Sequence, residues 1–466
     1  MTETPDTAPL VIHPHQDSHP TVSAPMEGKL PRRLGGWSTA AVTIGIMIGS
    51  GIFRVPATVA ADTGTAGAML LTWVVGGIVA LCGALALAEV AALYPSAGGM
   101  YVYLREAFGP LTAFLFGWLC LMILPTGAGA IALVFAEYLG QLLPPASAHA
   151  PLVAMAAIVL LATAQYRSLR FGAAIQNVST AAKVGAILAM SAAAFLLGDS
   201  GTGAWADAAS LRPATWSGFG LGVVTVLWAY NGWQDVTCLS GEVRDPGRAL
   251  PRAIVGGTLA VLVIYLAANA AYLRVLPVEA IAASPLVAAD MAVRLVGPVG
   301  SALVAALVCV STFGALNAVL MAIPRVFWAM ADDGLFFRTV AAVHPRHRTP
   351  HVAIAVMAGL AVVYLVFRTF EQLIEAFILA SLPFWALSVG SVIVLRRTRP
   401  ELPRPYRTPG YPFVPLLFVV AMSALVANSL WEHPEATTTS IGAVLAGVPV
   451  YFGWRLHGRR PRTGQA

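Results

Sequence analysis

The residue types best suited to hold a small polar ligand lie in the middle of two long apolar segments. Residues 43–53 read TIGIMIGSGIF and residues 227–235 read LWAYNGWQD. A helix interrupted at such a point leaves backbone amides without acceptors at the start of one half and carbonyls without donors at the end of the other. The amides suit a carboxylate and the carbonyls suit an ammonium group. Together they predict a site for a zwitterionic amino acid.

The glycines of the first stretch also have a purely structural interpretation. Gly45, Gly49 and Gly51 would form a small-residue face against which a neighbouring membrane helix packs closely. The second interruption, five spans later, favours a binding site instead. Interrupted segments at corresponding places in two halves of a chain are typical of transporter sites.

Lys183 is the basic residue that lies deepest inside an apolar segment, in a chain with 26 arginines and two lysines. A buried lysine can lose its proton, whereas arginine stays charged. Two roles therefore remain open for Lys183, a group that binds and releases a proton and a permanently charged strut. The structural alternative is a lysine that extends to the membrane surface, which its place well inside the span disfavours.

Carboxylates are expected toward the ends of the spans. Glu89 lies near the inner end of the second span, where it either pairs with a loop arginine or contributes to gating. Glu242, Arg244, Asp245 and Arg248 follow the second interrupted segment. They form either an inner-gate network of ion pairs or an ordinary solvated loop.

The composition shows what kind of elements position these residues. Of 466 residues, 58% are hydrophobic and 11% are charged, whereas soluble domains have about 25% charged residues. Apolar stretches of roughly 20 residues recur along the chain, as in membrane-spanning helices. We therefore predict an all-α polytopic membrane protein with about twelve transmembrane helices. The predicted spans are 37–60, 66–94, 111–140, 151–166, 171–197, 217–241, 252–273, 298–330, 351–367, 372–396, 412–431 and 438–456.

The basic residues predict how these spans are oriented. With both termini inside, 22 of the 28 lysines and arginines lie on the cytoplasmic side, five lie outside, and Lys183 lies within a span. This asymmetry follows the positive-inside rule, and it accounts for the net charge of +6 without any nucleic-acid partner. We expect a multi-pass protein of the bacterial inner (plasma) membrane, with cytoplasmic N and C termini.

The chain divides into one membrane domain and two short tails. Residues 1–34 are rich in polar residues and proline and lack the apolar core of a signal peptide, so we predict a disordered cytoplasmic tail. Residues 35–457 form the transmembrane domain, and 458–466 form a cytoplasmic C-terminal tail. The four cysteines lie in apolar segments and are expected to be packing residues rather than disulfide partners or metal ligands. No metal or cofactor is expected.

Several motifs, in this order, resemble those of the amino acid–polyamine–organocation (APC) superfamily, especially its L-amino acid transporter branch. The resemblance extends from about Trp37 to Arg407 and rests on the motifs GSGIF at 49–53, AEV at 88–90, SAGGMY at 96–101, QNVSTAAK at 176–183, WAYNGW at 228–233, GEVRDP at 241–246 and RPYRTPG at 404–410.

The resemblance implies a LeuT-type fold. This fold is a 5+5 inverted repeat with broken helices 1 and 6. The first repeat would cover about 37–197 and the second about 217–396, with peripheral helices at 412–456. Such a protein is a secondary transporter of amino acids and not an enzyme.

The resemblance also implies roles for individual residues, which are carried over position by position. The amides of Ser50 and Gly51, with Gly49 nearby, would hold the substrate carboxylate. The substrate amine would be received by the carbonyls of Met47, Trp228 and Asn231. Trp228 also stands where the family has an aromatic outer gate, and Asn231 replaces a common glycine. The side-chain pocket would include the third span around Thr126.

In Na+-independent members of the family, a lysine at the position of Lys183 stands where coupled relatives bind sodium. Its ammonium would bridge spans one, five and eight, and the eighth span supplies Ser311 and Thr312 as neighbours. The loop at 141–150 lacks the external cysteine of eukaryotic members, so no disulfide-linked partner subunit is expected.

The expected function is Na+-independent transport of neutral L-amino acids by exchange or proton symport. A cationic amino acid or polyamine is the alternative substrate, and it would favour a carboxylate in the pocket. A channel or proton-relay subunit usually has several ionisable residues at mid-membrane depth, whereas here Lys183 is nearly alone. An enzyme would need a catalytic constellation near the membrane surface, and His344, His347 and His351 show no such pattern.

Overall fold

The computed structural model describes residues 30–198, 215–367, 370–432 and 434–458. Most of the predicted N-terminal tail and nearly all of the predicted C-terminal tail lie outside these residues. Arg212 and Arg368, two of the five basic residues predicted to lie outside the membrane, also fall outside them. The described residues form helices and connecting turns, and an isolated β-bridge pairs Leu34 with Val243.

The helices succeed one another along the chain with short connections. They are α1 (Gly36–Met47), α2 (Gly51–Thr63), α3 (Ala66–Leu93), α4 (Met100–Phe108), α5 (Pro110–Met122), α6 (Leu124–Leu142), α7 (Pro144–Ser147), α8 (Ala150–Arg167), α9 (Leu169–Leu197), α11 (Trp216–Ala229), η2 (Asp235–Glu242), α12 (Pro246–Val275), α13 (Val278–Ala283), α14 (Val287–Val296), α15 (Val299–Ala322), α16 (Pro324–Asp332), η3 (Arg338–Ala341), α17 (His351–Phe367), α18 (Phe370–Thr398), α19 (Phe413–Glu432), α20 (Pro434–Leu445) and α21 (Gly447–Gly458).

Eight stretches of the described chain are long and apolar enough to cross a membrane. Large apolar side chains also cover the outside of the bundle, for example Val178, Leu196 and Trp431, which are 72%, 82% and 85% exposed. A soluble protein seldom leaves so much apolar surface in water, whereas lipid accepts it readily. The described part of the protein is therefore an all-helical, multi-pass membrane protein.

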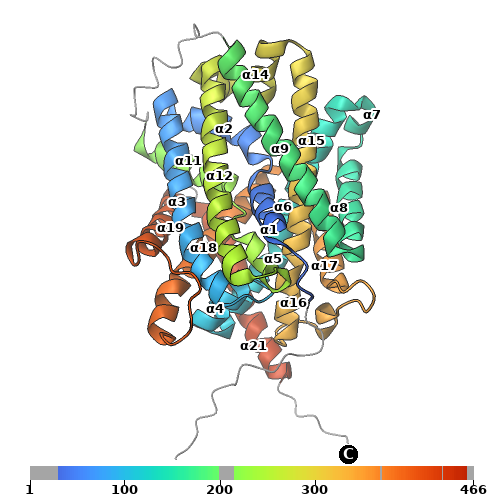
Figure 1. Ribbon diagram of the computed structural model, residues 1–466, viewed down its shortest axis with the longest axis vertical. Coiled ribbons are helices and arrows are strands. Elements are labelled where there is room, and N and C mark those ends of the chain that lie inside the picture. The colour runs from blue at the N-terminus through green and yellow to red at the C-terminus, as the bar shows by residue number, and fades with distance from the viewer. Residues whose placement is uncertain (1–29, 199–214, 368–369, 433, 459–466) are drawn as a thin grey trace, which may run out of the picture.

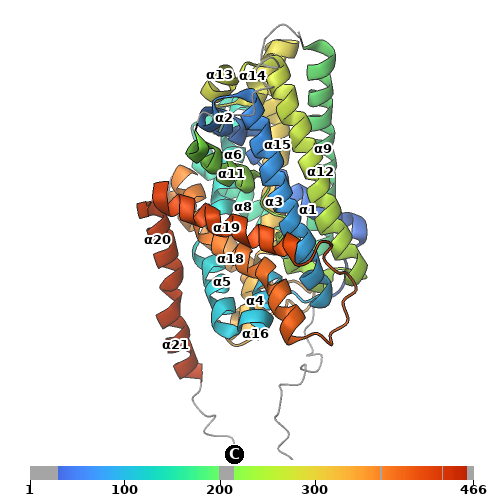
Figure 2. The same ribbon diagram turned by 90° about the vertical axis from the view of Figure 1, so that its left-hand side faces the viewer.

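Figure 1 shows that the bundle has two distinct ends. One end carries α4, α16 and the free end of α21, and we call it the terminal side. The other end carries α2, α7 and α14 and is called the opposite side. Figure 2 shows that α19 runs across the bundle, where it packs on α18 and α3, and that α20 and α21 lie at its flank. The last predicted span, 438–456, is divided between α20 and α21.

Both predicted helix interruptions are present. α1 ends at Met47 and α2 begins at Gly51, so the first span is broken over residues 48–50. α11 ends at Ala229, and a turn leads into the 3-10 helix η2, which begins at Asp235. The turn requires a glycine because Gly232 has a φ of 115°.

The two interruptions lie directly against each other. A Cβ atom on Gly51 would lie 2.9 Å from the Cα of Ala229, and one on Gly232 would lie 3.1 Å from the backbone nitrogen of Met47. Only glycine allows such a close approach of two backbones. α1 also packs against α9, α12 and α15, which surround it in Figure 1. The fold thus brings two distant sequence stretches to one point in the bundle.

Candidate functional site

The break in the first span leaves backbone amides available. The Gly49 amide donates to the Met47 carbonyl (2.9 Å) and the Phe53 amide donates to the Ser50 carbonyl (3.2 Å). Between them, the amides of Ser50, Gly51 and Ile52 have no hydrogen-bond acceptor within the described chain. These are the first N–H groups of α2, where the helix dipole is positive. They form a small donor set suited to an anionic oxygen.

The carbonyls at the same break have more hydrogen-bond partners within the protein than the sequence suggested. The Met47 carbonyl accepts from the Gly49 amide and from the Tyr265 hydroxyl of α12 (2.7 Å). The same hydroxyl lies 3.1 Å from the carbonyl of Ala229, the last residue of α11. Tyr265 therefore links the two broken helices. Sequence analysis missed it, although a tyrosine within the apolar span 252–273 was a weak signal.

The break in the sixth span is held partly by its own side chains. The Trp228 carbonyl accepts from the Asn231 amide (3.1 Å). The Asn231 side chain accepts a hydrogen bond from the Gln234 amide group, whose oxygen accepts from the Gly232 backbone (3.3 Å). Trp228 is partly buried, and its ring lies 3.5 Å from where a Cβ on Gly51 would be. The Trp228 ring thus lies beside the break in the first span.

Lys183 connects three helices. From α9 its Nζ donates to the carbonyls of Gly45 (2.8 Å) and Ile48 (2.5 Å) at the end of α1 and to the carbonyl of Ser311 on α15 (3.2 Å). The side chain is fully buried. An ammonium group has three N–H donors and a neutral amine has two. The three acceptors therefore match the charged form of Lys183.

The two predicted neighbours of Lys183 differ. The Ser311 hydroxyl lies 3.2 Å from the carbonyls of both Ile48 and Gly49, so it belongs to the same cluster. The Thr312 hydroxyl donates to the carbonyls of Val308 and Cys309 in its own helix. The structure therefore does not bring Thr312 to the lysine through a hydrogen bond.

Thr126 lies where the third span is interrupted. α5 ends at Met122 and α6 begins at Leu124, and the Thr126 hydroxyl donates to the Ile123 carbonyl (2.5 Å). The side chain is 5% exposed. Its hydroxyl is thus occupied at the bend between the two helices.

Charged residues on the terminal side pair with one another. Arg325 of α16 donates to both carboxylate oxygens of Glu242, the last residue of η2, at 3.1 and 3.2 Å. Each of these side chains is 1% exposed. The Glu242 carbonyl also accepts from the amides of Arg33 and Leu34, just before α1. This cluster joins the entry to α1, the end of η2 and the start of α16.

Of the four-residue cluster predicted after span six, only Glu242 is buried. Arg244, Asp245 and Arg248 are exposed. Arg325, which the sequence analysis did not single out, is the partner of Glu242. The only signal available was an arginine next to the proline that begins α16.

Glu89 forms a second network on this side. Its carboxylate accepts from Arg396 at the end of α18 (2.8 and 2.6 Å) and from the backbone and hydroxyl of Thr408 (2.7 and 2.8 Å). Arg404 lies 3.3 Å away. Glu89 thus pairs with arginines, one of the two expected arrangements.

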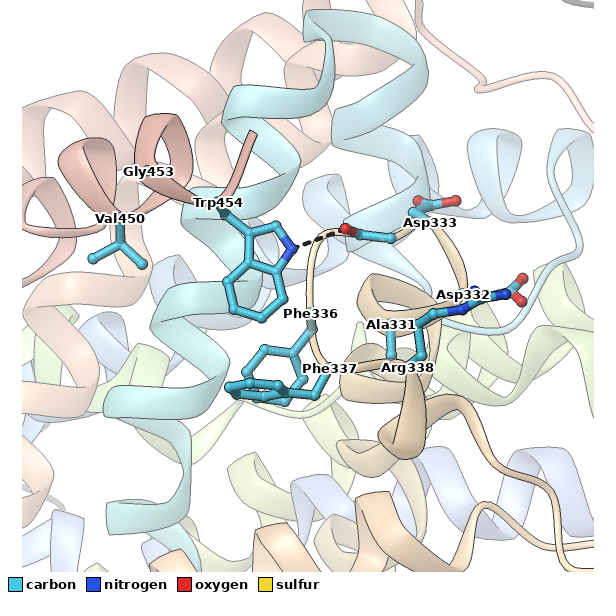
Figure 3. Close-up of a pocket in the computed structure, with 10 residues that line it drawn as sticks. Ala331, Asp332, Asp333, Phe336, Phe337, Arg338, Val450, Gly453 and Trp454 are labelled. Carbon is cyan, nitrogen blue, oxygen red and sulfur yellow. Dashed lines mark hydrogen bonds between the residues drawn. The ribbon is translucent and has the colours of Figure 1, made fainter. Parts of the chain in front are cut away.

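The terminal side also contains a cavity of about 920 Å³, away from the helix breaks. It lies between the segment that follows α16 and the end of α21 (Figure 3). Trp454 donates from its indole nitrogen to the carbonyl of Gly334 (2.9 Å), and Phe337 packs edge-on against its ring. None of the predicted site residues lines this cavity.

Comparison with known proteins identifies the family of this chain. The family model described as amino acid permease matches residues 34–451. The serine/threonine exchanger SteT of Bacillus subtilis (strain 168) is 31% identical over 91% of this chain and 97% of its own length. The b(0,+)-type amino acid transporter 1 of Mus musculus is 31% identical over 93% of this chain and 91% of its own.

The large neutral amino acids transporter small subunit 2 of Mus musculus is 30% identical over 94% of this chain and 85% of its own. These relatives and the family are transporters rather than enzymes, and the match extends over both helix breaks and all the paired charges described above. The chain belongs to the amino acid permease family of the APC superfamily.

Proposed function

We propose that the protein is a Na+-independent secondary transporter of neutral L-amino acids that works by alternating access. The proposed fold is a LeuT-type 5+5 inverted repeat of twelve spans, with repeats at about 37–197 and 217–396 and peripheral helices at 412–456. Support comes from the contact between the two helix breaks, which lie five spans apart in the sequence. Interrupted helices that meet near mid-membrane are the usual site of such transporters.

The three hydrogen bonds of Lys183 are the main support for the proposal that transport is independent of Na+. Three backbone carbonyls from α1 and α15 surround its ammonium. Carbonyl oxygens arranged around a point charge are also the ligands expected for a metal cation. A covalently attached cation at this point makes a bound sodium ion unnecessary. Its three hydrogen bonds support a permanently charged strut that couples α1, α9 and α15.

The substrate carboxylate is proposed to bind the amides of Ser50 and Gly51, with Gly49 shaping the turn. The carbonyls of Trp228 and Asn231 are proposed to receive the amine. The Met47 carbonyl would join them when the Tyr265 hydroxyl turns fully to Ala229, since it now accepts two hydrogen bonds. This exchange of partners would tie substrate binding to the link between the two broken helices.

The substrate side chain is proposed to lie toward Thr126, with Trp228 as the outer gate. The partial burial of the Trp228 ring beside Gly51 supports the gate. We also propose gating or coupling roles for Ser311, Thr312 and Glu89. Ser311 would act directly on the first break, Thr312 through the helix it stabilises, and Glu89 by holding the terminal-side network closed.

The terminal side is proposed to face the cytoplasm of a bacterium. Its support is the concentration of arginines there, including Arg105, Arg325, Arg396 and Arg404 among the described residues. We further propose that the protein works without a disulfide-linked subunit. All four cysteines of the chain are buried and unpaired in the structure.

The test is uptake of a panel of radiolabelled amino acids into proteoliposomes. Half the vesicles contain unlabelled amino acid and half are empty, each with and without an inward proton gradient, and each condition is run once with sodium and once with sodium replaced by choline. Uptake without sodium is the expected result. Uptake only into preloaded vesicles identifies exchange, and gradient-driven uptake into empty vesicles identifies proton symport. Transport of cationic amino acids or polyamines alone would contradict a neutral substrate, and a sodium requirement would contradict the role of Lys183.

A further inference from the structure

Three glutamates within or at the ends of the helices form ion pairs with arginines. Glu89 pairs with Arg396, Glu242 pairs with Arg325, and Glu137 at the opposite side pairs with Arg54 (2.6 Å). Asp235 differs from them. It is the first residue of η2, it is only 9% exposed, and its carboxylate has no hydrogen bond or ion pair within the described chain.

The surroundings of Asp235 hold it in place through the backbone. Its amide donates to the carbonyl of Gly232 in the sixth-span turn (3.1 Å). Further along η2, the carbonyl of Cys238 accepts from the amide of Gly98 (3.1 Å), which fixes η2 on the turn before α4. Asp235 therefore begins the short helix that runs from the helix break to the buried Glu242–Arg325 pair.

The groups around η2 offer no compensating positive charge close to Asp235. On α5 and η2 the neighbouring titratable groups are the thiols of Cys120 and Cys238. α1 carries no titratable side chain and α15 carries only Cys309. The remaining titratable or charged groups on the packed elements are Tyr101, Tyr103, Arg105 and Glu106 of α4, Tyr265, Tyr272, Arg248, Arg252 and Arg274 of α12, and Arg325 and Asp332 of α16. Arg105 and Arg325 are already paired with Asp333 and Glu242, and Arg248 and Arg252 are exposed.

A buried carboxylate without a partner is costly, at several kcal/mol for an ion inside a protein. A protonated carboxyl group avoids this cost, so the closed arrangement seen here favours a proton on Asp235. Lys183 is unsuited to carry the proton, because all three of its donors are engaged and loss of one would leave a carbonyl of α1 or α15 without a partner.

We propose that Asp235 is the proton-binding site that makes amino acid uptake by this protein proton-coupled. The inference rests on the proposed transport function and specifies its driving ion. A proton joins an Asp235 carboxylate oxygen while the site is open to the outside, and the neutral acid stays protonated through closure. When the Glu242–Arg325 pair separates and water reaches η2 from the terminal side, the O–H bond breaks. The proton passes to water and the carboxylate is hydrated.

The experiment compares wild type with Asp235→Asn in proteoliposomes that contain a pH-sensitive dye. Asparagine has the same shape as aspartate but does not take up a proton. Two quantities are measured, substrate-induced acidification of the lumen and accumulation of labelled amino acid in empty vesicles under an inward gradient of one pH unit. With one proton per substrate, this gradient supports roughly tenfold accumulation. Exchange into preloaded vesicles at equal pH is measured in parallel, because it needs no net proton movement.

For wild type we expect accumulation and acidification. For Asp235→Asn we expect both to be lost, with the accumulation ratio near one, while exchange continues. Asp62→Asn is the matched control. Asp62 is also an aspartate in a span, but it lies near the end of α2 on the opposite side, and its substitution should leave coupling intact.

Several results would overturn the proposal. The first is a wild-type protein that exchanges substrate but neither acidifies the lumen nor accumulates substrate in empty vesicles under the proton gradient, which leaves the transport function standing. The second is Asp235→Asn that retains coupling. The third is an Asp235→Asn variant that loses only the uptake of cationic amino acids, which would make Asp235 a selectivity residue. If Asp235→Asn loses exchange as well, Asp235→Glu, which keeps a titrating group, must accumulate substrate, and its failure to do so counts against the proposal. Absence of all amino acid transport by wild type would refute the transport function itself.

Discussion

The helix-break region and the terminal side handle polar groups in opposite ways. At the breaks, the amides of Ser50 and Gly51 lack acceptors, and a single buried cation, Lys183, is surrounded by neutral carbonyls. On the terminal side, carboxylates and guanidinium groups neutralise each other, as in the Glu242–Arg325 pair. A ligand gains little from groups that are already paired with each other, but it can form hydrogen bonds with backbone groups that have no partner. The first region is therefore built for binding and the second for closure.

Among the substitutions that test this contrast between the two regions, we expect Lys183→Ala to reduce transport most. It leaves the carbonyls of Gly45 and Ile48 without their donor and removes the link between α1, α9 and α15. A buried carbonyl left without its donor costs about 1–3 kcal/mol, and three carbonyls lose theirs here. We expect transport to fall by roughly a hundredfold or more while the protein still inserts into the membrane.

This is measured as initial exchange rate in proteoliposomes, normalised to the amount of reconstituted protein. Lys183→Arg serves as a control that keeps the charge but not the compact ammonium geometry. Transport by Lys183→Ala at the wild-type rate would remove the cluster from the mechanism.

Arg325→Met is expected to weaken closure on the terminal side. It leaves Glu242 buried without a partner, at a cost of about 3–5 kcal/mol to the closed arrangement. The thiol of Cys238 on η2, which is 3% exposed in this structure, should then react faster with a membrane-impermeant maleimide applied from the terminal side.

The double substitution Glu242→Gln with Arg325→Met removes both charges. Its labelling rate should return toward that of wild type, because no uncompensated ion remains. If the single and double substitutions label Cys238 equally fast, the ion pair does not hold the side closed.

Tyr265→Phe tests the link between the two broken helices. It removes the hydroxyl that lies between the carbonyls of Met47 and Ala229, and a buried hydrogen bond contributes about 0.5–1.5 kcal/mol. We expect a change of a few fold in the apparent KM for exchange, with a smaller effect on stability.

Tyr272→Phe is the matched control, from the same helix. Its hydroxyl bonds the carbonyl of Ile52 (3.3 Å), beyond the break. Equal effects of the two substitutions on KM would mean that Tyr265 contributes to packing alone.

The smallest effect is expected for the Arg54–Glu137 pair on the opposite side. Its side chains are 28% and 39% exposed, against 1% for each partner of Glu242–Arg325. Exposed pairs contribute about 0.2–1 kcal/mol and are screened by salt. Arg54→Gln should change the exchange rate less than Arg325→Met does, and the difference from wild type should shrink in high salt. If Arg54→Gln lowered the exchange rate more than Arg325→Met, the exposed pair would matter more than the buried one, contrary to this prediction.

The main outlines of the fold followed from local patterns. Apolar stretches predicted the eight segments that are long and apolar enough to cross a membrane. Glycines with polar neighbours predicted both helix breaks, because these signals come from residues near one another in sequence. The same reasoning selected Lys183, and the family resemblance added Ser311, which does meet it at the first break. The resemblance also implied Thr312, whose hydroxyl bonds its own helix instead. Adjacent residues on a helix point about 100° apart, and a sequence does not show which of the two faces the partner.

The sequence by itself determined that this is a multi-pass membrane protein with two interrupted helices, because hydrophobic length and glycine placement are properties of single segments. Only the tertiary structure decided which groups are satisfied. It showed that Tyr265 joins the two breaks, that Arg325 rather than a nearby loop arginine pairs with Glu242, and that Asp235 is buried without a partner. These contacts join residues many positions apart, so they depend on how whole helices pack, and no local pattern records that packing.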